Sequence, residues 1–263
     1  KTSSRKLRGE IGQFITPPPI AFFMASLFER PHKHVRILDA GAGTGVLFTS
    51  LVHRLCSRHD SPATIEVVAY ESDTALLPHL EEMMKICGRL CKEADILFKG
   101  EAISKDFIVE AAEEIEGGLF GGNGKRFTHA ILNPPYKKIN GDTLARKTLS
   151  SVGIETSNLY SAFVWLSVRL LEPSGEIVAI TPRSFCNGPY FYRYRKSLLD
   201  LISLRHVHLF ESRKDAFADD EVLQENVIFY GVRGEPSPEK LKLTISKGRD
   251  IDKAIFREML FEN

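Results

Sequence analysis

The stretch Val35-Arg-Ile-Leu-Asp39-Ala-Gly41-Ala-Gly43-Thr-Gly45 decides the fold of this chain. It begins as a short apolar run of strand length and continues as a turn with glycine at every other position. Apolar residues from Leu47 to Leu55 then recur at helical spacing. A strand, a glycine-rich turn and a helix are typical of a nucleotide-type site, because glycines admit a ligand to the backbone and the helix N-terminus offers N–H groups. The turn lacks the Lys-Ser/Thr of a phosphate-binding P-loop and the spacing of the dinucleotide fingerprint.

The rest of the chain alternates strand-like and helix-like segments. Six further strands are expected at residues 65–71, 95–99, 129–132, 176–181, 205–210 and 227–233. This alternation predicts an α/β fold, a seven-stranded and mostly parallel sheet with helices on both faces. The last two strands have no helix between them, which predicts an antiparallel hairpin at one edge. Lys240–Lys247 is a candidate for an extra strand, and Lys137–Thr156 is expected to be a mobile, lid-like loop.

Polar side chains stand where the second and third strands end. Glu71 lies 26 residues after Gly45, near the distance at which an acid reaches ribose hydroxyls in such folds. Its alternative role is that of a neighbour to a helix N-cap, since Ser72-Asp73 can open the next helix. Gly100-Glu101 follows the third strand. We therefore expect a ligand site at the carboxyl ends of the strands.

The fourth expected strand, His129–Leu132, ends abruptly in Asn133-Pro134-Pro135-Tyr136. Pro135 has no N–H group and cannot continue the ladder of a central strand, so the chain must turn. The turn brings an amide side chain, a proline carbonyl and an aromatic ring to one cleft. These groups suit a planar substrate that bears an NH2 group, with two acceptors for the amine and a ring to stack on it. The alternative is a proline-rich loop in which Asn133 is a turn former.

Composition narrows the class of protein. With 263 residues, 43% hydrophobic and 26% charged, the chain suits one large α/β domain, and its net charge of +1 argues against massive nonspecific binding of polyanions. Pro189–Lys196 interleaves aromatic and basic residues, which suits stacking and phosphate contact; a helix start with a solvated basic face is the alternative. No run of apolar residues is long enough for a membrane span.

The termini and the metal-binding residue types also carry expectations. The chain begins at Lys1 rather than Met, so we expect a trimmed or partial product, and it shows no secretory signal pattern. The four cysteines form no C-x-x-C pair and the eight histidines form no H-x-x-x-H cluster. We therefore expect a reduced, cytoplasmic protein without a structural metal.

Taken in order, these segments resemble class I S-adenosylmethionine-dependent methyltransferases. The resemblance is greatest to the gamma-class (TaqI-like) DNA adenine-N6 methyltransferases of bacterial restriction–modification systems, and it covers about Lys6 to Arg233. The segments that carry it are Gly12-Gln-Phe-Ile-Thr-Pro17, Leu38–Gly45, Val68-Ala-Tyr-Glu-Ser-Asp73, Asn133–Tyr136, and Asn158-Leu-Tyr-Ser-Ala-Phe163 through Thr181-Pro182.

The resemblance implies a cofactor, S-adenosylmethionine, and a set of residues that bind it. The residues at its methionine end would be Thr16, Asp39, Gly41, Gly43 and Gly45, with Asn133 close to them. Glu71 would bind the ribose. Glu101 would contact the adenine, in a position that usually holds Asp, and Asp106 is the alternative.

The resemblance also implies how a target base is held. Asn133 and Pro134 would accept hydrogen bonds from the amine of an adenine flipped out of double-stranded DNA, and Tyr136 would stack on it. Phe217 is the candidate for a second stacking ring, with Phe210 behind it, or else an apolar anchor of its loop.

Three domains and several partners follow from the resemblance. Residues 1–30 would close over the cofactor, 31–233 would form the catalytic domain, and 234–263 would begin a target-recognition domain that is otherwise missing. Recognition would otherwise come from a partner subunit or the Lys137–Thr156 loop. The resemblance to restriction–modification enzymes also suggests a cognate endonuclease as a partner, which the sequence itself does not reveal. The chain has no PD-(D/E)xK arrangement, so we expect no cleavage activity from it. The alternatives are methylation of an RNA amine or a protein glutamine, or a noncatalytic DNA-specificity subunit.

Overall fold

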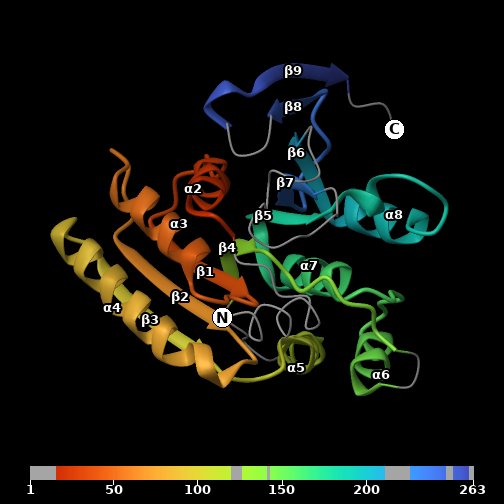
Figure 1. Cartoon of the computed structure of the whole chain (residues 1–263), viewed down its shortest axis with the longest axis horizontal. Helices are drawn as coiled ribbons and strands as arrows, with labels where there is room; N and C mark the ends of the chain where they lie inside the picture. The colour runs from red at the N-terminus through yellow and green to blue at the C-terminus, as the bar shows by residue number, and fades with distance from the viewer. Residues whose placement is uncertain (1–15, 120–125, 141–142, 211–225, 247–250, 261–263) are drawn as a thin grey trace, which may run out of the picture.

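The structure, a computed structural model, describes residues 16–119, 126–140, 143–210, 226–246 and 251–260 (Figure 1). Within these ranges nine strands form one sheet in the order β3-β2-β1-β4-β5-β7-β6-β8-β9. Strand β7 is antiparallel to both of its neighbours and β9 is antiparallel to β8, whereas the other neighbouring pairs are parallel. The strands are β1 (His34–Ala40), β2 (Thr64–Tyr70), β3 (Leu97–Ile103), β4 (Phe127–Leu132), β5 (Leu171–Pro182), β6 (Ile202–Phe210), β7 (Asn226–Arg233), β8 (Lys240–Ser246) and β9 (Ile255–Leu260).

The sheet is wider than the seven strands that the sequence predicted. Strand β8, the candidate extra strand, pairs with β6, and β9 then pairs with β8, so the hairpin of β6 and β7 lies inside the sheet instead of at its edge. An exposed edge of β6 would leave a row of backbone groups unpaired, and β8 satisfies them. All side chains of β9 are exposed, so no alternation of buried and exposed residues reveals this strand in the sequence.

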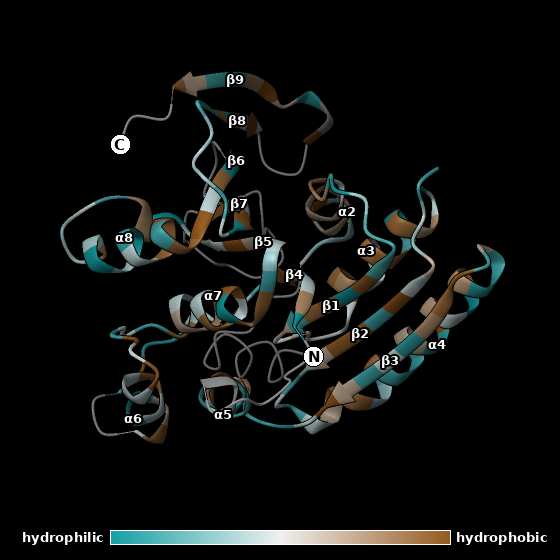
Figure 2. Cartoon of the chain, turned by 180° about the vertical axis from the view of Figure 1, so that it is seen from behind, coloured by the Kyte–Doolittle hydropathy of each residue, from teal (hydrophilic) through white to brown (hydrophobic). Residues whose placement is uncertain are grey.

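Helices cover both faces of the sheet (Figure 1). Helices α2 (Pro18–Ser26), α3 (Val46–Cys56) and α4 (Leu77–Glu93) pack on one face, and α5 (Phe107–Leu119), α7 (Leu159–Leu170) and α8 (Tyr192–Leu201) on the other. Every residue of β4 is buried, as expected for a parallel strand between two helical layers. Figure 2 shows hydrophobic residues along β1 and β7 and hydrophilic ones on α4 and α8.

Two further observations concern the helices. The segment expected to be a lid-like loop contains α6 (Leu144–Ser151), whose N-cap residue Thr143 accepts a hydrogen bond from the Arg146 N–H. The sequence did not predict this helix because its composition is polar and only Leu149 of α6 is buried.

Among the described residues, no helix combines the length and the hydropathy that a membrane crossing requires.

The sheet brings the polar residues at the strand ends together. Strands β1, β2 and β4 run parallel, and Ala40 at the end of β1 is in register with Tyr70 at the end of β2. The glycine turn, Glu71 and Asn133 directly follow these three strands. They therefore meet at one edge, the place where open α/β sheets bind ligands.

Candidate active site

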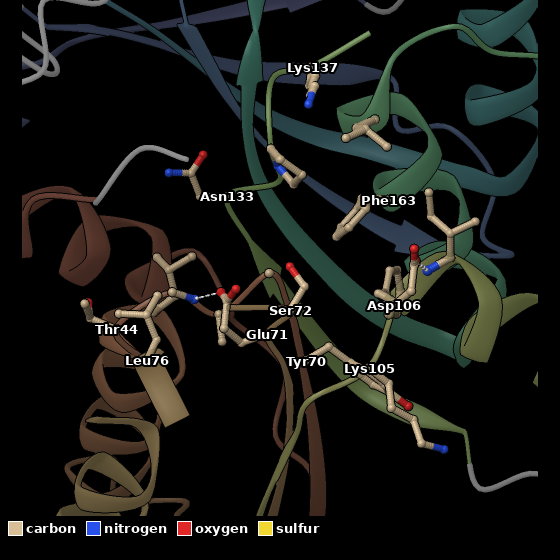
Figure 3. A pocket seen from close by; sticks show the side chains of 18 of the residues that line it. Thr44, Tyr70, Glu71, Ser72, Leu76, Lys105, Asp106, Asn133, Lys137 and Phe163 are labelled. Carbon is tan, nitrogen blue, oxygen red and sulfur yellow. Dashed lines mark hydrogen bonds between the residues drawn. The ribbon is translucent and has the colours of Figure 1, made fainter. Parts of the chain in front are cut away.

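A cavity of about 290 Å³ lies at this edge (Figure 3). Five of the residues expected at the site line it: Thr16, Gly41, Gly43, Glu71 and Asn133. In Figure 3, Asn133 and Asp106 lie on opposite sides of the cavity, and Glu71 lies next to the glycine turn. Residues from five separate segments thus meet around one space.

The glycine turn and Glu71 hold each other in place. The backbone N–H groups of Gly41 and Ala42 both donate to the Tyr70 carbonyl at 2.9 Å. The Gly43 N–H donates to Glu71 Oε2 at 2.9 Å, and the Asp73 N–H donates to Glu71 Oε1 at 2.8 Å. Gly43 has a φ of 56°, and a Cβ built there would meet no atom within 4 Å. The buried carboxylate is therefore fixed, and the backbone at Gly43 faces open space.

Asp39 and Gly45 lie beneath the turn instead of lining the cavity. Asp39 is fully buried, and its Oδ2 accepts a hydrogen bond from the Phe48 N–H at 3.3 Å. Burial, with a smaller contribution from the charge of Glu71, raises the pKa of Asp39 to about 8. Gly45 has a φ of 81° where α3 begins, and a Cβ there would lie 2.7 Å from Phe48 Cε1. Asp39 and Gly45 therefore support the conformation of the turn through their contacts with Phe48.

The structure puts Asp106, and not Glu101, at the cavity. Strand β3 extends to Ile103, so Glu101 lies inside the strand and its side chain is exposed. The expected end of this strand at Lys99 was wrong, because Gly100 continues the ladder with its partner Val67. Asp106 lies in the loop after β3, lines the cavity, and accepts a hydrogen bond from the Ile108 N–H at 2.8 Å.

The Asn133–Tyr136 segment forms the opposite wall. The Asn133 side-chain Nδ2 donates to Thr16 Oγ1 at 3.0 Å, which ties the N-terminal segment to the end of β4. Pro135 lines the cavity, whereas Pro134 and Tyr136 are not among the residues that line it. The Tyr136 hydroxyl donates to the Ile180 carbonyl at 3.3 Å, and its ring meets Tyr160 edge-on at 6.3 Å between centroids. Burial raises the pKa of Tyr136 well above its usual value.

An aromatic wall was not anticipated from the sequence. Tyr70, Phe107 and Phe163 line the cavity, with ring centroids 5.2 Å apart for Tyr70 and Phe107 and 5.0 Å for Phe107 and Phe163. The sequence did offer a signal for two of these rings: Phe107 directly follows Asp106, and Phe163 ends one of the motifs that carry the resemblance. Phe217 lies in residues 211–225, outside the described residues, and Phe210 is buried at the end of β6.

Comparisons with known proteins place the chain in a family. The family model described as Eco57I restriction-modification methylase matches residues 69–217, more than half of the chain. The chain belongs to the Eco57I methylase family. It is 48% identical over 244 residues to the type II methyltransferase M.BsuBI of Bacillus subtilis and 40% identical over 256 residues to M.PstI of Providencia stuartii. These matches cover 92% and 97% of the chain and 47% and 50% of the relatives, so the chain spans about half their length.

Solved structures support the fold of this Eco57I-family chain. A protein from Listeria monocytogenes described as a class I S-adenosylmethionine-dependent methyltransferase aligns with a TM-score of 0.66 at 18% identity, covering 92% of this chain and 69% of that one. The type IIG restriction endonuclease BpuSI aligns with a TM-score of 0.69 at 16% identity, covering 97% and 32%. The predicted α/β class is confirmed, with nine strands in place of seven.

The Listeria protein is described as S-adenosylmethionine-dependent, so this cofactor can be compared with the cavity. The cavity fits this group in three respects. The aromatic wall and the Asp106 carboxylate suit an adenine with its amine, the fixed Glu71 carboxylate suits ribose hydroxyls, and the open backbone at Gly43 admits a ligand closely.

Proposed function

We propose that this chain is the catalytic part of a DNA methyltransferase that methylates N6 of adenine within a restriction–modification system. The single observation that carries the proposal is the convergence of Asn133 with the cofactor cavity at the end of β4. The order of the motifs along the chain, with the glycine turn before Asn133–Tyr136, supports the gamma class. DNA methylation also agrees with the names of the type II relatives.

In the proposed mechanism, the target amine is activated by orientation. Asn133 Oδ1 and the Pro134 carbonyl accept its two N–H groups, which favours a tetrahedral nitrogen with its lone pair directed at the methyl donor. When bound, the cofactor supplies an electrophilic methyl group on a sulfonium. The bond from Asn133 Nδ2 to Thr16 Oγ1 fixes which end of the amide faces the N-terminal segment, so the oxygen end serves the amine. After transfer, the methylated nitrogen releases one proton to solvent.

Tyr136 acts as a stacking ring in this proposal. Because burial raises its pKa, the phenol stays protonated at neutral pH and does not serve as a base. Its hydroxyl bond to the Ile180 carbonyl fixes the ring beside Asn133. An adenine cannot reach Asn133 within a duplex, so it is flipped out, and Phe217 remains the proposed second stacking ring.

The N-terminal segment and the DNA contacts complete the proposal. Residues 1–30 are proposed to close over the cofactor; residues 1–15 lie outside the described residues, and Thr16 lines the cavity and contacts Asn133. Exposed Tyr190 and Tyr192, with Arg193 beside them, contact the DNA strand. Because the relatives are about twice as long, we place target recognition largely outside these residues, with a cognate endonuclease as partner. Residues 1–263 alone should then bind DNA weakly and the cofactor normally.

The test of the substrate class is transfer of a tritiated methyl group to three acceptors: plasmid DNA, tRNA and a protein extract. DNA should be supplied at high concentration, because weak binding is expected. Label in DNA supports the proposal. Label in protein or tRNA but not in DNA would instead indicate a glutamine or RNA methyltransferase, and no label on any acceptor would indicate a noncatalytic module.

A further inference from the structure

A second polar cluster lies toward the amino ends of the central strands, away from the cofactor cavity. His129 of β4 pairs in register with Glu176 of β5, and His32 comes from the segment between α2 and β1. The side chains of His129 and Glu176 are fully buried, and that of His32 is 18% exposed. Two imidazoles and a carboxylate thus meet inside the fold, next to the ring of Phe28.

The three groups converge through single atoms. Glu176 Oε2 lies 3.3 Å from His129 Nε2 and 3.9 Å from His32 Nε2, and all three atoms lie within 4.8 Å of one another. All three are buried and have no hydrogen-bond partner among the described residues. Leaving a buried polar atom unsatisfied is destabilising, so three at one point require an explanation.

The other atoms of the two buried groups are already engaged. The Thr128 hydroxyl accepts a hydrogen bond from the Arg36 N–H at 2.8 Å and lies 2.7 Å from His129 Nδ1, so it engages that nitrogen of the imidazole. Glu176 Oε1 accepts hydrogen bonds from the Tyr230 hydroxyl at 2.6 Å and the Glu29 N–H at 3.3 Å. What remains is His129 Nε2, which lies 3.3 Å from Glu176 Oε2.

Glu176 Oε2 makes no hydrogen bond to either imidazole, although His129 Nε2 lies only 3.3 Å away. A proton on Glu176 could satisfy one imidazole, but it would leave the other, because 3.9 Å is too long for a hydrogen bond. A cation satisfies all three atoms. Tetrahedral zinc, with bonds of about 2.0–2.1 Å, places its ligand atoms about 3.3 Å apart, which matches the distance from His129 to Glu176.

We propose that His32, His129 and Glu176 bind a divalent transition-metal ion of the Zn2+ type, with water completing its coordination. Two imidazoles and one carboxylate are a ligand set that such ions accept. Thr128 and Tyr230 supply the outer hydrogen bonds that orient metal ligands in proteins.

Carboxylates compensate the positive charges nearest to the cluster. The two neighbouring arginines are each paired with a carboxylate through two nitrogen–oxygen contacts, Arg30 with Glu235 and Arg58 with Asp60. Arg58 also donates to the carbonyls of Phe28 and Glu29, which fixes the segment that leads to His32. The site is therefore shaped before a metal binds.

The proposed role of the metal is structural. Asn133 is the fourth residue after His129, about 13 Å along extended chain, so a metal here does not touch the reacting atoms. It joins the segment after α2 to β4 and β5. The inference rests on these contacts alone and holds whether or not the chain methylates adenine.

The test uses an untagged chain, because a polyhistidine tag binds the same ions. The protein is stripped with a chelator and titrated with Co2+, whose absorption spectrum reports coordination, and Zn2+ equivalents are counted by mass spectrometry. The matched variants are His32→Gln and His34→Gln, since His34 is exposed and lies two residues away on the same segment. We expect one equivalent in the wild type and in His34→Gln, and binding weakened by at least about 100-fold in His32→Gln.

Thermal melting supplies the second readout. Zn2+ should raise the Tm of the wild type and of His34→Gln with increasing concentration, and should leave that of His32→Gln unchanged. Absence of bound metal in the wild type would overturn the proposal and leave a shared proton or a buried water between the three groups. Equal binding by His32→Gln, or loss of binding in His34→Gln alone, would also overturn it.

Discussion

The two ends of strand β4 carry different kinds of polar site. At the carboxyl end, Asn133 borders an open cavity whose carboxylate, Glu71, is fixed by backbone N–H groups. Toward the amino end, His129 and Glu176 are fully buried, and three atoms converge on one point. This difference in accessibility determines which kind of ligand each site suits. A cavity lined by prepositioned groups suits a ligand that enters and leaves at every turnover, whereas a closed point suits a small ion that stays.

The largest expected effect is a loss of methyl transfer when the residue at the carboxyl end of β4 is substituted. Asn133→Ala removes an acceptor for the target amine and should lower kcat by about 10²- to 10³-fold. Metal binding at the other end should not change. The measurement is methyl transfer in single turnover, with Asn140→Ala, an exposed residue of the following loop, as control.

Normal turnover by Asn133→Ala would show that Asn133 takes no part in methyl transfer.

The reciprocal variant changes the buried cluster instead of the cavity. His32→Gln should leave cofactor affinity within about twofold, because the distance between the sites excludes direct contact. A large loss of cofactor affinity in His32→Gln would show that the two ends are coupled.

The glycine turn offers the next effect. Gly45→Ala places a Cβ 2.7 Å from the Phe48 ring at a φ of 81°, and should lower the free energy of unfolding by roughly 2–4 kcal/mol. Gly43→Ala has a φ of 56° but meets no atom within 4 Å, so it should cost only about 1–2 kcal/mol. Urea unfolding measures both, and equal losses would contradict the packing described beneath the turn.

A pair of acids tests the adenine end of the cavity. Asp106→Ala removes a carboxylate from the lining and should raise the Kd for S-adenosylmethionine roughly 10- to 100-fold. Glu101→Ala changes an exposed residue within β3 and should leave the Kd unchanged. Calorimetric titration of the cofactor into each variant decides between them, and the opposite pattern would restore Glu101 as the contact.

The smallest effect is a pH dependence to which Asp39 and His129 contribute with opposite signs. Asp39 has a pKa of about 8 in the folded chain, above its usual value, so folding retains a proton and stability falls as pH rises toward 8. Burial lowers the pKa of His129 to about 3, so its contribution makes stability rise with pH and is complete above the usual histidine pKa.

Between pH 6.5 and 8, Asp39 therefore dominates this pair. The free energy of unfolding should fall by at most about 1.4 kcal/mol per pH unit in this range, and Asp39→Asn should abolish the fall. Denaturant unfolding of the metal-free and cofactor-free protein at several pH values measures the slope. An unchanged slope in Asp39→Asn would show that Asp39 is ionised when folded.

The same comparison explains what the sequence could predict. Gly41, Gly43, Glu71 and Asn133 could be expected at one edge because they lie in the turns that follow parallel strands, whose carboxyl ends meet, and all four line the cavity. Glu101 was expected at the end of β3 because this strand, which has no fully buried residue, does not show its end as an apolar run. An expectation based on strand ends is only as accurate as the ends themselves.

The buried cluster could not be predicted, because its members come from three distant segments. His32, His129 and Glu176 follow no spacing motif, and only the register of β4 on β5 and the path of the α2–β1 segment bring them together. Without a C-x-x-C pair or an H-x-x-x-H cluster, the sequence predicted no structural metal. Strand β9 was missed for a related reason, since its pairing depends on β8 and not on a buried face.

The most direct test of the account identifies the methylated base. Plasmid DNA labelled by the protein and tritiated S-adenosylmethionine is digested to nucleosides and separated by chromatography. The account predicts that the label elutes with N6-methyldeoxyadenosine and is absent when Asn133→Ala replaces the wild type. Label in a methylated cytosine, or undiminished label with Asn133→Ala, would contradict it.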